Sequence, residues 1–99
     1  MFDKAKKMWE LQTKAKKLQQ ELREMQFEGV ELGGKVKVVV DGEQKIVSIH
    51  IDDSLMDPAE KDSLIKFLTQ AFAAASKRAQ QSAAQKTKEA MGGLGIPGL

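Results

Sequence analysis

The twenty residues 33–52 (GGKVKVVVDGEQKIVSIHID) most constrain what this chain can fold into. β-Branched residues alternate with other types on both sides of Asp41-Gly42, which is the pattern of a β-hairpin. Glycine tolerates the positive φ of a tight turn, and aspartate accepts hydrogen bonds from its own backbone there. An isolated hairpin is only marginally stable in water, so its apolar face needs a cover. We predict that this face holds Val36, Val38, Val40, Val47, Ile49 and Ile51.

The segment before the hairpin, residues 27–32 (FEGVEL), is predicted to form a first, irregular edge strand. Gly29 interrupts it and indicates either a bulge or a close approach of another backbone. The three strands then follow one another as an antiparallel meander. Because the edges of such a sheet present unpaired backbone groups, they favour pairing with a second copy of the chain.

A long helix is predicted before the sheet. Residues 2–25 contain neither proline nor glycine. A helix of this length spans about 35 Å, whereas strands of ordinary length span about 17–20 Å. The helix therefore needs a partner helix, from the same chain or from a second copy. Its apolar residues follow a coiled-coil heptad and form a seam of Met8, Leu11, Ala15, Leu18, Leu22 and Met25.

A second helix is predicted after the sheet, with Asp57 as N-cap, Pro58 at the first position and Glu60 completing a capping box. It runs to about Met91 and stops at the glycines that follow. Its first half is apolar and is expected to cover the sheet, whereas its second half either packs on the first helix or projects into solvent. The predicted dimer or core residues are Val36, Val38, Val40, Val47, Ile49, Ile51, Leu64, Leu68 and Phe72.

The resulting prediction is an α+β protein of the order α-β-β-β-α. Residues 1–91 form a single dimerising domain, and residues 92–99 form a flexible glycine-rich tail. The net charge is only +2, but it is unevenly distributed. Residues 1–27 carry seven basic and four acidic groups, residues 28–56 carry three and six, and residues 57–99 carry six and four. An anionic partner is therefore expected to meet the helices rather than the sheet.

Several features restrict the chemistry. The chain has no cysteine and a single histidine, His50, which we interpret as a surface residue. We expect no catalytic site, metal, cofactor or small-molecule substrate, because such sites need converging titratable groups. No apolar run is long enough to span a membrane, so a cytoplasmic protein is expected. Trp9 lies off the heptad seam, either as a second packing patch or as a residue that stacks on bases.

Three stretches carry a family resemblance: MFDKAKKM at the start, FEGVELGGKVKVVVDGEQKIVSIHIDDSL in the middle, and AFAAASKRA in the second helix. Together with the Gly/Pro-containing tail, they make the chain similar to the YbaB/EbfC family of nucleoid-associated proteins. The resemblance implies a tweezer-like homodimer whose helices project as paired arms. It also implies binding of double-stranded DNA with little sequence preference, a role in nucleoid organisation or gene regulation, and no catalytic site.

The basic residues are open to two interpretations, a solvated coiled-coil exterior or a surface that binds phosphates. Lysine contacts phosphate as a point charge, without reading sequence. A coiled-coil scaffold module with incidental nucleic-acid affinity is the alternative function, and RNA binding is a third. The resemblance does not identify the residues that touch DNA. From charge and position we predict Lys14, Lys16, Lys17, Arg23, Lys77, Arg78, Lys86 and Lys88.

Overall fold

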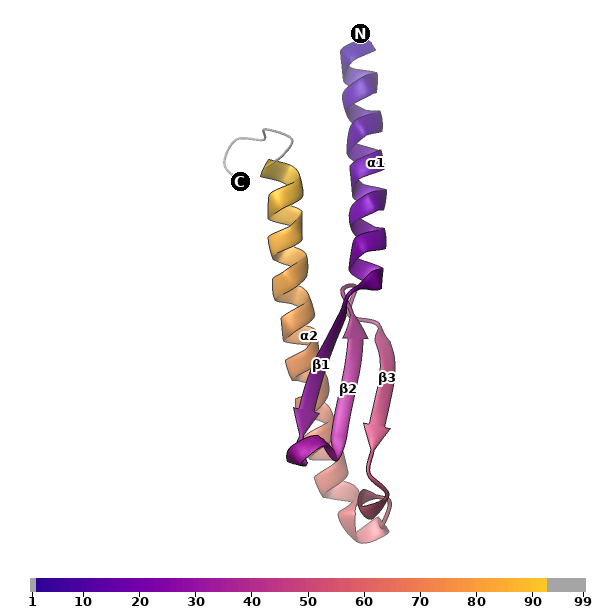
Figure 1. Cartoon of the computed structure of the whole chain (residues 1–99), viewed down its shortest axis with the longest axis vertical. Helices are drawn as coiled ribbons and strands as arrows, with labels where there is room; N and C mark the ends of the chain where they lie inside the picture. The colour runs from indigo at the N-terminus through magenta and orange to yellow at the C-terminus, as the bar shows by residue number, and fades with distance from the viewer. Residues whose placement is uncertain (1, 93–99) are drawn as a thin grey trace.

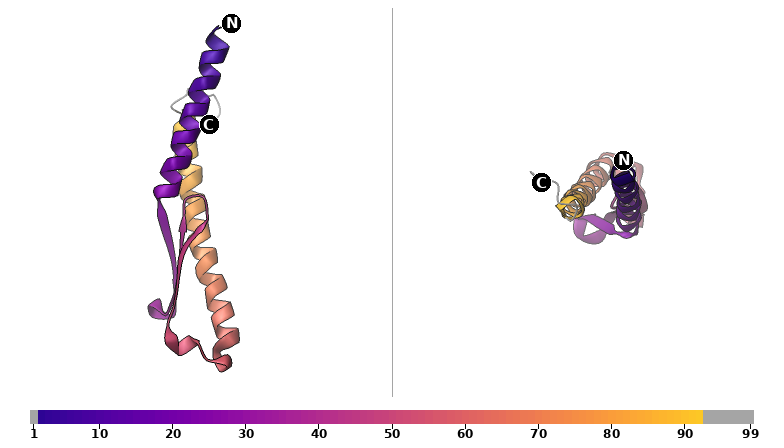
Figure 2. Two further views of the ribbon diagram at one scale, coloured as in Figure 1. Left: turned by 90° about the vertical axis from the view of Figure 1, so that its right-hand side faces the viewer. Right: turned by 90° about the horizontal axis from the view of Figure 1, so that it is seen from above.

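The computed structural model describes residues 2–92, and it confirms the predicted α-β-β-β-α order (Figure 1). Helix α1 (Phe2–Glu24) leads into strands β1 (Gln26–Glu31), β2 (Val36–Asp41) and β3 (Ile46–Ile51), and helix α2 (Lys61–Gly92) ends the fold. The molecule is an elongated rod of 67 × 22 × 17 Å (Figure 2). Gly92 is the last residue of α2, one residue beyond the predicted domain boundary. The rest of the predicted flexible tail, residues 93–99, lies outside the described residues.

The sheet is an antiparallel meander in the order β1-β2-β3. Strand β1 pairs with β2 without interruption, from Gln26 opposite Asp41 to Glu31 opposite Val36, so the predicted irregularity of the first strand is wrong. The irregularity lies between β2 and β3, where the register shifts at Val39 and Val40. As a result Ile46, rather than the predicted Val47, stands opposite Val40 on the face that turns toward α2.

Helix α2 covers one face of the sheet, over β1 and β2. The expected close approach at Gly29 is confirmed, because a Cβ atom there would lie 1.7 Å from the carbonyl oxygen of Ala71. Alanines therefore face the sheet along this stretch of α2, and their small side chains let the helix backbone sit directly on β1. The buried core consists of Val36, Val38, Val40, Leu55, Ala71, Ala75 and Ala79.

The predicted core residues divide into two sets. Val36, Val38 and Val40 are fully buried, and Ile51, Leu64 and Leu68 pack against them. Val47, Ile49 and Phe72 are exposed in the single chain, so for these three residues a place in the core or in a dimer interface stays a prediction. Val47 and Ile49 are exposed because α2 lies over the first two strands and leaves β3 uncovered.

A turn of 3₁₀-helix, residues Pro58–Glu60, leads directly into α2. The carboxylate of Asp57 accepts a hydrogen bond of 2.9 Å from the backbone N–H of Ala59, as expected of an N-cap. The reciprocal half of the predicted capping box is wrong. Among the described residues no hydrogen bond joins the Asp57 N–H to the Glu60 side chain, and the backbone N–H of Glu60 donates to the Asp57 carbonyl at 2.8 Å instead.

The turn between β2 and β3 connects the sheet to both helices. Asp41 accepts hydrogen bonds from the backbone of Glu43 and Lys45, as predicted, but Gln44 has the positive φ of +68° that was expected of Gly42. The N–H of Gly42 donates instead to the Leu22 carbonyl of α1 at 2.7 Å. The side-chain oxygen of Gln44 accepts hydrogen bonds from Ser76 and Gln80 of α2. The turn therefore joins the C-terminal end of α1 to the middle of α2.

Candidate nucleic-acid interface

Helix α1 and the second half of α2 extend beyond the sheet as two antiparallel arms (Figure 1). The heptad seam of α1 faces α2, so of the two sources predicted for a partner helix the same chain supplies one. Leu11, Ala15 and Leu18 line a groove opposite Thr87, Ala90 and Met91. Closer to the sheet, the Ser82 hydroxyl lies 3.9 Å from the Met25 sulfur.

Charge is separated along the length of the rod. Helix α1 carries seven basic and four acidic residues, a net charge of +3, and residues 77–92 carry four basic and one acidic residue, also +3. Residues 25–76, which include the sheet and the first half of α2, carry five basic and nine acidic residues, a net charge of −4. The arms therefore form the basic end of the molecule. The sheet and the first half of α2 form its acidic end.

Three of the predicted DNA-binding residues meet in a cleft between the arms. Lys14 and Lys17 of α1 and Lys86 of α2 line a cavity of about 320 Å³ together with Glu21 and Glu89. The ammonium of Lys86 lies 3.6 Å from a carboxylate oxygen of Glu21. Because two carboxylates share this cleft with three ammonium groups, its net attraction for an anion is small.

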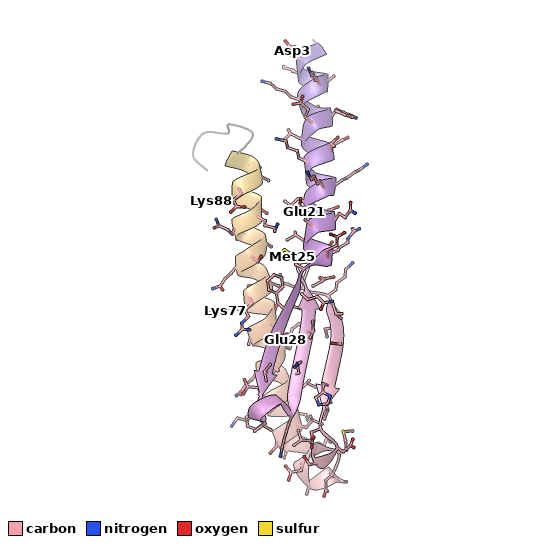
Figure 3. The ribbon with its side chains drawn as sticks, in the orientation of Figure 1. Asp3, Glu21, Met25, Glu28, Lys77 and Lys88 are labelled. Atoms are coloured by element: carbon pink, nitrogen blue, oxygen red, sulfur yellow. The ribbon has the colours of Figure 1, made fainter. Side chains whose placement is uncertain are left out.

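Three other predicted residues point away from the cleft. Lys77 and Lys88 lie on the side of α2 that faces away from α1 (Figure 3). Lys16 lies about 200° around α1 from Leu18, which faces α2. Among residues 3–92 the ion pairs are Arg23–Glu43, Lys37–Glu28, Lys45–Glu43 and Lys86–Glu21, so none of these three lysines is neutralised by one. They present full positive charge to solvent on the outer surfaces of both arms.

The two predicted arginines link the arms to the sheet. Arg23 forms a 2.6 Å hydrogen-bonded ion pair with Glu43 of the β2–β3 turn. Arg78 donates a 2.9 Å hydrogen bond to the backbone carbonyl of Glu28 in β1. Sequence reasoning missed both links because the partners lie 20 and 50 residues away. The structure therefore separates the eight predicted residues into a cleft group, an outer group and two links.

Trp9, which the sequence leaves open as a packing residue or a base-stacking residue, is 66% exposed on α1. In the described part of the chain no three metal-ligating side chains lie together, and no helix has the length and apolar character of a membrane span. The hydroxyl and backbone N–H of Ser54, at 2.5 and 3.0 Å, lower the pKa of Asp52 below its usual value of 3.8. These bonds cap the turn after β3 at the acidic end of the molecule.

Comparison with known proteins decides the family. A sequence model of the YbaB/EbfC DNA-binding family matches residues 1–94. The chain belongs to this family. It is 34% identical to a nucleoid-associated protein of Syntrophobacter fumaroxidans, over 99% of this chain and 89% of the relative. A nucleoid-associated protein of Caldanaerobacter subterraneus is 33% identical, over 95% and 85% of the two chains.

The fold recurs in a solved structure. The crystal structure of an uncharacterized protein from Helicobacter pylori superimposes with a TM-score of 0.67 at 20% identity, covering 79% of this chain and 90% of that one. This likeness concerns the fold, whereas the family model and the nucleoid-associated relatives confirm the resemblance to YbaB/EbfC proteins inferred from the sequence. Within this DNA-binding family, the basic arms are the part of the chain whose charge suits a polyanion.

Proposed function

We propose that two copies of this YbaB/EbfC protein bind double-stranded DNA through the lysines of their arms, with little sequence specificity. The observation that supports this most strongly is the separation of charge, with a net +3 on each arm and −4 on the remainder of the chain. The acidic end repels phosphates while both arms attract them. DNA is therefore held by the arms of the rod and not by the sheet.

The outer group of lysines, Lys16, Lys77 and Lys88, makes the main phosphate contacts in this proposal. No described carboxylate forms an ion pair with them, whereas Lys14, Lys17 and Lys86 share their cleft with Glu21 and Glu89. Neutralising phosphates releases condensed counterions, which supplies the binding free energy and makes it fall with salt. The arms present no Arg- or Asn-rich recognition surface, so base reading contributes little.

Dimerisation is the second part of the proposal. Strand β3 is an edge strand that α2 leaves uncovered, and a hollow of about 260 Å³ opens beside it. Its walls are apolar apart from one threonine, and they include the exposed side chains of Ile46, Ile49 and Phe72. A second copy that buries this surface places two pairs of arms on one DNA molecule, which raises the effective concentration for the second contact.

The biological role that follows is that of a cytoplasmic, nucleoid-associated protein that organises DNA or regulates genes without catalysing a reaction. Binding that relies on phosphates covers many sites along a chromosome, because every sequence offers the same backbone. A dimer with two arm pairs can also hold two segments of duplex together. Both properties suit a protein that compacts or shapes DNA.

The test is a titration of duplex DNA at several salt concentrations with a Lys16→Gln, Lys77→Gln, Lys88→Gln triple variant. Each phosphate contact adds about 0.9 to the slope of log K against log salt concentration. The triple variant is expected to bind more weakly and to lose up to about 2.7 from this slope for each bound protomer.

The matched control replaces Lys35, Lys61 and Lys66 by glutamine. These three lysines lie at the acidic end of the rod, so the control changes the net charge equally. We expect the control to keep the wild-type slope. Equal slopes for the two triple variants would contradict the arm model, because net charge alone would then explain binding.

A further inference from the structure

Trp9 lies on the outer side of α1, away from α2. It is about 180° around the helix from Leu18, which lines the groove between the arms. Its side chain is 66% exposed. Helix α1 also extends beyond the end of α2, so the turns that carry Trp9 stand at the tip of the rod (Figure 1). Most of the indole ring is therefore accessible to a ligand.

The indole belongs to a basic face of the helix. Within residues 5–20, the side chains that lie within about 60° of Trp9 around the helix are all exposed and none is acidic: Ala5, Lys6, Gln12, Thr13, Lys16 and Gln20. The only carboxylate of this stretch, Glu10, lies about 100° away. In the part of the chain that the structure describes, neither Lys6 nor Lys16 belongs to an ion pair. This face therefore attracts an anion.

The two lysines flank the indole along the helix axis. Lys6 lies about 4.5 Å to one side of Trp9 and Lys16 about 10.5 Å to the other, at about 1.5 Å per residue. Successive phosphates of one DNA strand are about 3.4 Å apart along the duplex axis, so these intervals correspond to about one and three nucleotide steps. An aromatic ring between cations that follow a phosphate backbone is an arrangement that binds exposed bases.

An intact duplex offers no free base face to this ring, because its bases stack on one another. Opening a base step costs about as much free energy as stacking a base on an aromatic side chain returns. The cost is smaller where a base is mismatched or already unpaired. Trp9 is therefore expected to add affinity at interruptions of the duplex and little elsewhere.

We propose that Trp9 stacks on an unpaired base while Lys6 and Lys16 contact the phosphates on either side of it. The protein consequently binds a duplex interrupted by unpaired bases more tightly than an intact one. The inference rests on the proposed function, because the lysines of the arms bring the DNA to α1. It adds a preference for DNA structure, which phosphate contacts alone do not provide.

The test compares two labelled duplexes of equal length, one fully paired and one with a short run of mismatches at its centre. Both carry the same number of phosphates, so counterion release is matched between them. The wild type is expected to bind the mismatched duplex about tenfold more tightly. Trp9→Ala is expected to lose this preference and to bind intact duplex as the wild type does. Trp9→Phe, which keeps an aromatic ring, is expected to retain most of the preference.

Met8→Ala is the matched control. Met8 is 63% exposed but lies about 100° around the helix from Trp9, on the seam. This variant is expected to keep the wild-type preference, and circular dichroism verifies that each variant keeps its helices. A preference that survives in Trp9→Ala would overturn the inference. Its loss in Met8→Ala as well would also do so, because the effect would then belong to the helix end and not to the indole.

The outcomes separate this inference from the proposed function. Equal affinity of the wild type for the two duplexes would overturn the stacking role and leave DNA binding by the arms intact. No binding to either duplex would overturn both. If Trp9→Ala dissociated the dimer in light scattering and lost affinity equally for both duplexes, Trp9 would be an assembly residue, and the stacking role would be wrong.

Fluorescence of the wild type gives a direct readout, because Trp9 is the only tryptophan and the chain has no tyrosine. Stacking on a base quenches the emission of an indole. At saturation, the mismatched duplex is expected to quench this emission more strongly than the intact duplex. Equal quenching by the two duplexes, or no quenching by either, would show that the ring does not meet an unpaired base.

Discussion

At the scale of single residues, the missing side chain of Gly29 sets how closely helix α2 packs on strand β1. Gly29→Ala places a methyl carbon 1.7 Å from the Ala71 carbonyl oxygen. The methyl carbon is bonded directly to the backbone of β1, and the oxygen is part of the backbone of α2. Neither can move without separating β1 from α2. We expect the free energy of unfolding, measured by urea denaturation, to fall by about 3 kcal/mol or more.

Gly92→Ala is the matched control for this substitution. Gly92 is helical and a Cβ atom there meets nothing within 4 Å, so alanine is expected to leave stability unchanged or raise it by up to about 1 kcal/mol. If Gly29→Ala proved as mild as this control, α2 would have to sit further from β1 than the structure places it.

Asp52 provides a residue-scale prediction about pH. Its pKa is lowered mainly by the Ser54 hydroxyl and next by the Ser54 backbone N–H. A lowered folded-state pKa means that this interaction stabilises the fold above the unfolded value, near 3.8, and is lost as the pH falls through the folded-state pKa. Ser54→Ala removes the larger contribution. We therefore expect the pKa of the Asp52 carboxyl, followed by NMR titration, to rise toward its usual value.

Thr13→Ala serves as the control for that titration, because it removes a hydroxyl that bonds the Trp9 carbonyl on the distant arm. The Asp52 titration curve is expected to be unchanged in this variant. An unchanged curve in Ser54→Ala as well would assign the lowered pKa to the Ser54 backbone N–H, which this variant keeps, and to the neighbouring charges of Lys35 and His50.

At the scale of elements, the β2–β3 turn sets the direction of α1. Gly42 donates to the Leu22 carbonyl at 2.7 Å, and a Cβ atom there would lie 2.4 Å from the same oxygen. Gly42→Ala is therefore expected to release α1 from the turn while leaving the sheet folded. Spin labels at Gln20→Cys and Gln81→Cys, diluted with unlabelled protein, should report a longer and broader distance between the arms.

Arg23→Ala is the milder comparison at the same joint. It removes the Arg23–Glu43 pair, whose arginine side chain is largely exposed, and keeps the backbone bond from Gly42. Such exposed pairs contribute up to about 1 kcal/mol, so the distance distribution is expected to change little. A larger change in Arg23→Ala than in Gly42→Ala would make the ion pair the main restraint on the arm.

The elements also show how much of this protein its sequence predicts. Period-2 alternation predicts the hairpin, the heptad predicts the first helix and capping residues predict the second, because each of these signals depends only on residues close together in the sequence. The bulge that places Ile46 instead of Val47 on the α2-facing side of the sheet depends on how the strands pair, and no pattern of neighbouring residues predicts it. The sequence predicts Gly42 as a turn glycine. In the structure its N–H donates a hydrogen bond to the carbonyl of Leu22, 20 residues earlier.

Contacts between residues far apart in the sequence also limit what can be predicted about the candidate interface. Residue type and position predict that the arms are basic. They do not predict that Arg23 and Arg78 are engaged by Glu43 and Glu28, or that Lys86 lies beside Glu21. These partners come from elements that meet only after folding. Charge alone therefore identifies the basic part of the chain, and only the folded geometry shows which of its lysines lie beside carboxylates.

At the scale of the whole molecule, the uncovered strand β3 leads to a prediction about assembly. Ile49 is 46% exposed on strand β3, on the α2-facing side of the sheet but beyond the strands that α2 covers, and it lines the apolar hollow beside Phe72. If a second copy covers this surface, Ile49→Asp buries a charge in the interface and prevents association. Light scattering is expected to give a mass near 10.9 kDa for this variant and about twice that for the wild type.

Val30→Asp is a control with the same exposure, because Val30 is also 46% exposed but lies on the opposite face of the sheet, on β1. It is expected to remain dimeric and to bind duplex DNA as the wild type does. Ile49→Asp keeps every arm lysine yet is expected to bind DNA at least tenfold more weakly, because only one pair of arms then acts at a time. A monomeric Ile49→Asp protein with wild-type affinity would separate DNA binding from assembly, and one arm pair would then be the complete binding unit.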